Sequence, residues 1–228
     1  MEPPRLTGIR ACVFDAYGTL FDVNSAAAQE KDALGDKWQP LAEMWRTKQL
    51  QYTWLRSLMG RHADFWQVTG EALDYAMTSL KVDDPALRER LMSLYLKLNS
   101  YPEVKATLER LKAGGMKLAI LSNGSPKMLS AATENAGIAG LLDAVLSVEE
   151  VGVFKVHPSV YALATQRFGL DREQICFMSS NGWDAHAAKA YGFHVIWCNR
   201  FGQAPEQMPE VPDGQITTLA ALPEILGI

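Results

Sequence analysis

Five short apolar segments, each ending at a polar or glycine-rich turn, constrain the fold of this chain more than any other feature. They read ACVF before Asp15, LAIL before Ser122, DAVLS, ICFM before Ser179, and HVIWC before Asn199. Runs of this length with little polar alternation are typical of strands buried on both faces of a sheet. The stretches between them have helical periodicity, and alternating strands and helices favour a doubly wound, parallel α/β sheet.

Proline and glycine mark the ends of the expected helices. Ser125-Pro126 and His157-Pro158 indicate helix starts, because proline suits the first helical position. Helices expected over residues 103–113 and 126–136 run into glycine, a common helix stop. After Phe201, three prolines indicate an irregular loop before a last short strand and helix.

Residues 24–99 break the alternation, because they show helical periodicity and no convincing strand. One apolar stripe consists of Leu41, Met44, Trp45, Tyr52, Leu55 and Leu58. We therefore predict a Rossmann-like core domain of residues 1–22 and 100–228, with a helical cap subdomain of residues 23–99 inserted after the first strand.

Composition and charge exclude several classes of protein. The chain has 228 residues, 48% hydrophobic, and this length buries a core without disulfides or a structural metal. The net charge is -4 and the Lys and Arg residues are scattered, so the sequence shows no basic patch of the kind that binds nucleic acid. No stretch reaches the roughly 18 apolar residues of a membrane span, and the N-terminus lacks a signal-peptide run. Cys12, Cys176 and Cys198 fall in apolar strands, which suggests buried, reduced thiols. We expect a cytoplasmic protein that binds neither nucleic acid nor membranes.

Polar side chains follow the expected strands, at the edge where parallel sheets bind ligands. Four separate loops present hydroxyl, amide and charged groups there. The residues are Asp15, Thr19, Ser122, Asn123, Lys155, Ser179, Asn181 and Asp184. Their convergence predicts an active site at the carboxyl ends of the strands.

These motifs resemble the haloacid dehalogenase superfamily, whose first motif is Asp-x-x-x-Thr, as in FDAYGTL here. LSNG, VFK and SSNGWDAHAAKAYGF match later motifs. The chain particularly resembles the metal-independent L-2-haloacid dehalogenases, whose pattern has Tyr two residues after the nucleophile and a cap helix like WRTKQLQYTWLRSLM at Trp45–Met59. The resemblance covers nearly the whole chain and includes the inserted cap.

Tyr17 favours dehalogenation over phosphoryl transfer as the predicted reaction. Members of the superfamily that transfer phosphate have Asp-x-Asp at this motif, and the second carboxylate shuttles a proton to the leaving group. They also bind Mg²⁺ between carboxylates. A tyrosine, with a pKa near about 10, is a poor acid or base at neutral pH. A halide leaves without a proton, so dehalogenation needs no second Asp. A phosphatase or phosphonatase remains the alternative, and so does a non-catalytic module that binds small carboxylates.

The resemblance implies a role for each matching residue. Asp15 would attack the halogen-bearing carbon and form an aspartyl ester, and Lys155 would stabilise its anion. Arg46 would receive the halide and orient the substrate carboxylate. A turn-capping Asp, a solvated Lys and an exposed helix Arg are the plainer interpretations. The family usually has proline after the lysine, whereas this chain has Val156.

The remaining assignments complete the expected site. Ser122 and Asn123 would bind the substrate carboxylate at a helix N-terminus, or simply cap that helix. Supporting positions are Thr19, Tyr161, Ser179, Asn181 and Asp184, and which of them activates the hydrolytic water stays open. The expected apolar wall consists of Tyr17, Leu50, Phe65 and Trp183, although aromatics at such spacings also suit a plain core.

Together these features predict an L-2-haloacid dehalogenase that converts 2-haloalkanoic acids to 2-hydroxy acids with inversion. The histidines have no partners at ligand spacing, so we expect no metal and no organic cofactor. The expected partners are a small 2-haloacid and halide ion, and the family resemblance implies a homodimer formed through the cap helices. Neither the preferred halogen nor the preferred chain length follows from the sequence.

Overall fold

A computed structural model describes residues 5–23 and 29–228. Its six strands form one parallel sheet in the order β3-β2-β1-β4-β5-β6. The strands are β1 (Ala11–Phe14), β2 (Lys117–Ser122), β3 (Ala144–Ser147), β4 (Ile175–Ser179), β5 (His194–Cys198) and β6 (Gly214–Ile216). The predicted doubly wound parallel sheet is therefore confirmed. The strand order reverses between β1 and β4, so the loops after these two strands flank the switch point.

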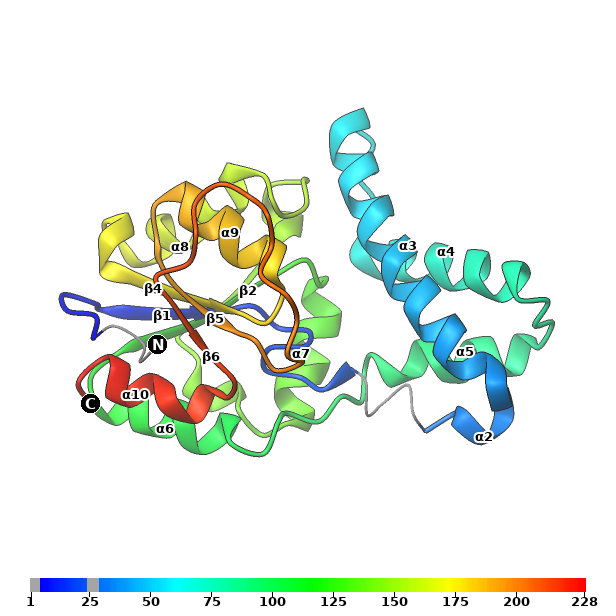
Figure 1. The fold of residues 1–228 in the computed structure, drawn as a ribbon, viewed down its shortest axis with the longest axis horizontal. Coiled ribbons are helices and arrows are strands. Elements are labelled where there is room, and N and C mark those ends of the chain that lie inside the picture. Colours follow the sequence, from blue (N-terminus) through cyan, green and yellow to red (C-terminus); the bar gives the residue numbers. More distant parts are fainter. Residues whose placement is uncertain (1–4, 24–28) are drawn as a thin grey trace.

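Helices cover both faces of the sheet, with α8 and α9 above it and α6 and α10 below it in Figure 1. The helices of this part are α6 (Val104–Ala113), α7 (Pro126–Asn135), α8 (Pro158–Phe168), α9 (Gly182–Tyr191) and α10 (Leu222–Ile225). Short 3-10 turns are η2 (Ala139–Leu141), η3 (Val148–Glu150), η4 (Arg172–Gln174) and η5 (Leu219–Ala221). Pro126 and Pro158 open α7 and α8, as predicted.

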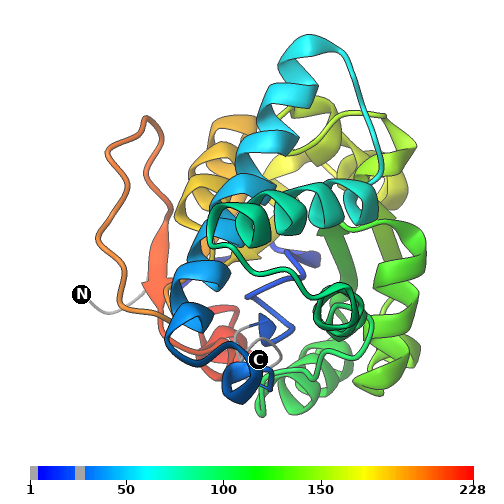
Figure 2. The same ribbon diagram turned by 90° about the vertical axis from the view of Figure 1, so that its right-hand side faces the viewer.

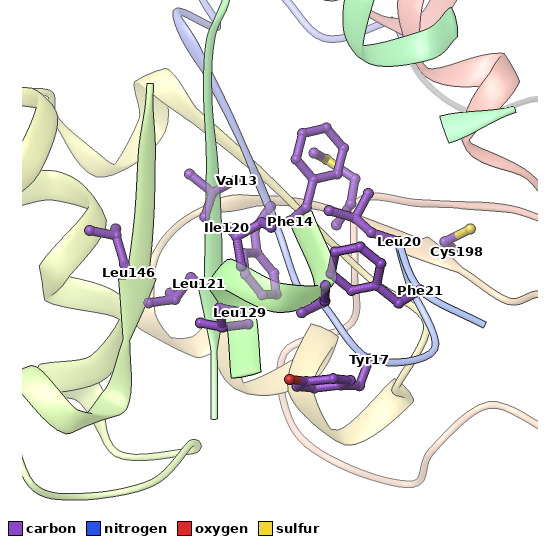
Figure 3. Close-up of a cluster of buried hydrophobic side chains, with 14 of the residues drawn as sticks. Val13, Phe14, Tyr17, Leu20, Phe21, Ile120, Leu121, Leu129, Leu146 and Cys198 are labelled. Atoms are coloured by element: carbon purple, nitrogen blue, oxygen red, sulfur yellow. The ribbon is translucent and has the colours of Figure 1, made fainter. Parts of the chain in front are cut away.

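The core is built where β1 and β2 meet the flanking helices. All four residues of β1 are buried, and Figure 3 shows Val13 and Phe14 grouped with Ile120, Leu121 and Leu129. A continuous apolar strand in the centre of the sheet loses its surface to both layers. Cys12, Cys176 and Cys198 are buried free thiols, as the sequence predicts.

The inserted segment is helical over its described residues, which contain α2 (Lys31–Leu34), η1 (Gly35–Lys37), α3 (Trp38–Met59), α4 (Phe65–Ser79) and α5 (Pro85–Leu94). Figure 1 shows these helices beside the sheet, and Figure 2, viewed from that side, shows α3 and α4 in front of it. The two connections between the core and the inserted segment lie next to each other, because the Asp22 backbone N–H donates to the Asn99 carbonyl. The domain boundaries at 22/23 and 99/100 stay a prediction, and residues 1–4 and 24–28 lie outside the described residues.

One expectation for α3 is wrong. Leu55 and Leu58 belong to the predicted apolar stripe, yet they are 50% and 84% exposed. The start of the stripe is buried at Leu41 and Trp45, and the Trp45 ring N–H donates to the Thr69 carbonyl of α4 at 2.8 Å. Figure 1 shows the C-terminal end of α3 extending beyond the neighbouring helices. Arg56 and Ser57 still contact Glu71 and Phe154 there, but Leu55 and Leu58 lie on a side of the helix that the described residues leave exposed. No helix in the described part of the chain is both long and apolar enough to cross a bilayer.

Candidate active site

Asp15 directly follows the central strand β1, and its carboxylate is held from three sides. Lys155 Nζ donates to Oδ1 at 3.0 Å, and the Thr19 hydroxyl and the Asn181 side-chain amide each donate to Oδ2 at 3.0 Å. Asp15 is only 6% exposed. Burying an ionised carboxylate is costly unless donors compensate it, and here a cation, a hydroxyl and an amide do so.

Lys155 is buried between two carboxylates. Its Nζ lies 3.0 Å from Asp15 and 2.8 Å from Asp184, and the residue is 1% exposed. Burial alone would lower the pKa of this ammonium, but Asp15 and Asp184 outweigh it and raise the pKa above the ordinary lysine value. The solvated-loop interpretation of Lys155 does not apply.

Asp184, from the first turn of α9, holds the other side of the lysine. Its second oxygen accepts a hydrogen bond from the Tyr161 hydroxyl at 2.7 Å. Complete burial raises the pKa of the Asp184 carboxyl, and Lys155 opposes that rise. Tyr161 is one of the predicted supporting positions, and through Asp184 it supports the pair of Lys155 and Asp15 from behind.

The loop that carries Lys155 is anchored by a predicted site residue. The Lys155 backbone N–H donates to the side-chain oxygen of Asn123 at 3.0 Å. The peptide bond between Lys155 and Val156 is cis, at the position where the family usually has proline. Asn123 therefore fixes the Lys155 loop beside the turn after β2.

A second set of hydrogen bonds joins the loops after β1 and β4. The Ser180 backbone N–H donates to the Thr19 hydroxyl at 2.8 Å, and the Asn181 backbone N–H donates to the Ser179 hydroxyl at 3.1 Å. Ser179 thus shapes the turn that presents Asn181, without itself contacting Asp15. Arg200 adds a contact from the loop after β5 by donating to the Thr19 carbonyl at 2.8 Å.

Arg46 reaches the site from α3. Its guanidinium donates to the Asn181 side-chain oxygen at 3.2 Å and to the buried Gln49 side chain at 2.7 Å. Gln49 in turn donates to the Thr69 hydroxyl of α4 at 2.7 Å. The arginine is therefore fixed on the cap side while it joins the same asparagine that binds Asp15.

A cavity of about 10 Å³ opens in front of Asp15. Ten predicted site residues line it, namely Asp15, Tyr17, Arg46, Leu50, Phe65, Ser122, Asn123, Lys155, Asn181 and Trp183. The Tyr17 ring stacks on Phe65 with 6.0 Å between centroids. Burial raises the pKa of Tyr17 well above the ordinary tyrosine value, so this side chain stays neutral. Its hydroxyl is buried without a hydrogen-bond partner among the described residues.

The structure brings together all of the predicted site residues. Thr19, Ser179 and Asp184 form hydrogen bonds with residues that line the cavity, and Tyr161 lies one hydrogen bond further away. Sequence reasoning missed Gln49 and Ser180. Gln49 lies one helical turn after Arg46, on the same face, and that spacing could have identified it. Within residues 5–23 and 29–228, no group of three or more His, Cys, Asp or Glu side chains is arranged to hold a metal ion.

Comparison with known proteins identifies the family of the chain that carries this site. Residues 9–192 match the model of the haloacid dehalogenase-like hydrolases. The (S)-2-haloacid dehalogenase 4A of Burkholderia cepacia is 42% identical, covering 96% of this chain and 95% of its own length. The (S)-2-haloacid dehalogenase of Pseudomonas sp. strain YL is 44% identical over 95% of this chain and 94% of its own. The chain belongs to the haloacid dehalogenase-like hydrolase family.

A solved relative matches the whole architecture. The L-2-haloacid dehalogenase of Xanthobacter autotrophicus, solved with chloropropionic acid covalently bound, superposes with a TM-score of 0.89 at 39% identity. The match covers 95% of this chain and 98% of that one. The predicted relationship to the L-2-haloacid dehalogenases is confirmed.

Proposed function

We propose that this protein is an (S)-2-haloacid dehalogenase, which hydrolyses 2-haloalkanoic acids to 2-hydroxy acids with inversion at the reacting carbon. The observation that carries the proposal is the buried Asp15 carboxylate, bound by Lys155 and facing a small cavity in which Tyr17 stands where a phosphatase has its second acid. The relatives that bear this name match nearly the full length of the chain.

In the first step, an Asp15 oxygen forms a bond to C2 of the substrate as the carbon–halogen bond breaks. The halide leaves with the bonding electrons and needs no proton, so a neutral Tyr17 is no obstacle. Backside displacement accounts for the inversion. Lys155 places its ammonium 3.0 Å from the Asp15 carboxylate, and Arg46, which faces the same cavity, receives the halide.

Substrate orientation depends on the turn after β2. Ser122 and Asn123 line the cavity next to the start of α7. The Ser122 hydroxyl already accepts the Gly124 backbone N–H at 3.0 Å, which leaves its own proton free for a substrate carboxylate. This arrangement places the anionic end of the acid away from Asp15.

In the second step, water attacks the ester carbonyl carbon of Asp15. The bond between that carbon and the substrate oxygen breaks, the 2-hydroxy acid leaves, and one solvent oxygen stays in Asp15. Asp184 suits the role of proton acceptor, because burial raises its pKa and Lys155 connects it to Asp15. Asn181 positions the ester through its contact with Oδ2.

The proposal is tested with (S)-2-chloropropionate in buffer containing EDTA. We expect stoichiometric chloride and (R)-lactate, and a single turnover in H₂¹⁸O should place the label in Asp15 before it reaches product. Asp15→Asn should abolish chloride release while keeping the wild-type circular dichroism spectrum. Inactivity here, together with Mg²⁺-dependent hydrolysis of a phosphate ester, would refute the proposal.

The proposal extends to assembly and location. The exposed apolar end of α3, formed by Leu55, Leu58 and Met59, supports a homodimer formed through the cap helices. Three buried free thiols support a reducing compartment such as the cytoplasm.

A further inference from the structure

A second cavity lies beside the catalytic one, and the proposed chemistry does not use it. Its volume is about 390 Å³, within the range of small-molecule sites. Most of its lining is aliphatic or aromatic. The side chains that define it are Ala42, Trp45, Leu91, Leu94, Tyr101 and Phe201. The exposed Phe201 lies on a loop, whereas Leu91 and Leu94 are buried in the cap. We refer to this space as the apolar chamber.

The apolar chamber and the catalytic cavity share a wall. Tyr17, Arg46 and Asn181 line both spaces. Two of these side chains are joined by one hydrogen bond of 3.2 Å, from the Arg46 guanidinium to the Asn181 oxygen. The catalytic cavity, at about 10 Å³, is close to the roughly 10–15 Å³ that a single water molecule needs. An acid with a long apolar tail therefore needs adjoining space, and the chamber borders the catalytic cavity directly.

Arg46 gives this apolar space one specific polar group. Among the residues that the structure describes, it forms no ion pair with a carboxylate, and its partners Gln49 and Asn181 are neutral amides. Its charge also reaches Tyr95, another residue of the chamber lining. A cation without an anionic partner at the end of an apolar cavity suits a carboxylic acid with a large apolar substituent.

We propose that the apolar chamber is a binding site for carboxylic acids with apolar tails of about six to eight carbons, which extends the substrate class to 2-haloacids of that size. A non-halogenated acid places its carboxylate at Arg46 and its tail among Trp45, Leu91 and Leu94. In a 2-haloacid the carboxylate stays at Ser122 and Asn123, Arg46 receives the halide, and only the tail enters the chamber. When the hydrogen bond between Arg46 and Asn181 breaks, the chamber and the catalytic cavity become continuous. This substrate class rests on the proposed dehalogenase function, but the binding of a non-halogenated acid does not.

The binding test uses octanoate and propionate, titrated calorimetrically into the wild-type protein and two variants. Ala42→Trp fills the chamber from a half-buried position of α3, and Glu43→Trp adds the same side chain at the exposed neighbouring position. Each buried methylene strengthens binding about fourfold. We expect octanoate to bind the wild type and Glu43→Trp at least about tenfold more tightly than propionate, and Ala42→Trp to lose this difference.

The activity test compares (S)-2-chlorooctanoate with (S)-2-chloropropionate. Ala42→Trp should lower kcat/KM for the long acid at least about tenfold and leave chloride release from the short acid within about twofold, which also shows that the variant folds. If Ala42→Trp does not fold, Phe201→Ala at the exposed rim should weaken octanoate binding at least about threefold.

Equal binding of octanoate and propionate by the wild type would overturn the inference, as would an octanoate preference that survives Ala42→Trp. Inactivity of the wild type on chloropropionate with octanoate binding intact would instead overturn the proposed function and leave the binding site standing.

Discussion

At the scale of single residues, Lys155 balances the charge of two buried carboxylates. It is the one cation that the structure shows in contact with both Asp15 and Asp184, and all three side chains are buried. Buried ion pairs offer little net stability over an apolar replacement, but removing one partner leaves a buried charge uncompensated. Two carboxylates would then face each other, and one of them would take up a proton.

We predict that Lys155→Met lowers kcat at least about 100-fold and destabilises the fold by about 3 kcal/mol, because Asp15 and Asp184 lose the cation buried between them. Chloride release and urea unfolding measure the two effects. Lys155→Arg keeps the charge but not the shape, and it should recover more of the stability than of the activity. Near-normal turnover by Lys155→Met would contradict the role given to this lysine.

Glu103 provides a pH-dependent contribution to stability. Burial alone would raise the pKa of its carboxyl, but hydrogen bonds from its own backbone and from Arg200 outweigh burial and lower the pKa. Arg200 lies 2.7 Å from Glu103 and also binds the Thr19 carbonyl. A depressed folded-state pKa gives stability that is present above the unfolded value, about 4.3, and is lost as the pH falls through the folded value.

We therefore predict that Glu103→Gln is less stable than the wild type by about 1 kcal/mol at pH 7, and that the difference disappears as the pH falls below about 4. Urea unfolding of both proteins from pH 7 to pH 3 measures it. A difference that stays constant over this range would show that the charge of Glu103 does not contribute.

The sequence predicted which residues meet at the site, but not every contact between them. Asp15, Lys155 and Asp184 follow separate strands, and the topology of a parallel sheet brings strand ends together. The partner of Tyr161 depended on the rotation of α8 relative to α9, which residue identity does not define. Gln49 was missed although it lies one helical turn after Arg46, because its burial and its hydrogen bond to Thr69 depend on how α3 packs against α4.

At the scale of elements, the turn between β2 and α7 is packed directly against Tyr17. A Cβ atom on Gly124 would lie 2.8 Å from the tyrosine ring and 3.0 Å from Leu129. The tyrosine is confined on its other side, where it stacks on Phe65 of α4. The absence of a side chain at Gly124 is therefore what lets Tyr17 lie against this turn.

We predict that Gly124→Ala displaces Tyr17 and costs about 1–3 kcal/mol of stability, with kcat/KM lowered about tenfold because the substrate wall shifts. Chemical denaturation and steady-state kinetics measure these effects. Gly140→Ala is the matched control, because a Cβ there would meet no atom within 4 Å. If the two variants behave alike, the close approach of Tyr17 has no consequence.

The elements themselves follow from the sequence to different degrees. Apolar runs predicted the strands because a central parallel strand is buried on both faces, as β1 is. The apolar stripe of α3 was a weaker guide, because helical spacing says which residues share a face but not whether a partner covers it. The buried residues of α3 recur every four positions, at Leu41, Trp45, Gln49 and Thr53. Leu58 lies on the opposite side of the helix, where it is exposed.

At the scale of the whole molecule, the cap and the core meet mainly through α3 and the turn that follows it. Arg46 binds Asn181, Ser57 accepts the Phe154 backbone N–H at 3.1 Å, and His62 lies 3.0 Å from Glu149. The α3 face turned toward the core is thus occupied. Its last turns expose Leu55, Leu58 and Met59, which the fold of one chain leaves uncovered.

We predict that these three side chains are buried in a homodimer, since contiguous exposed apolar groups mark interaction surfaces. Sedimentation velocity should give twice the chain mass of 25.2 kDa for the wild type and the monomer for Leu58→Asp. The control is Val211→Asp, which places the same charge on another exposed apolar residue, on the loop after β5, and should leave the dimer intact. Because Arg46 lies on the same helix, loss of the dimer should also lower activity through a less rigid α3. A wild-type protein that sediments as a monomer at micromolar concentration would exclude this interface, and a dimeric Leu58→Asp would place it elsewhere on the surface.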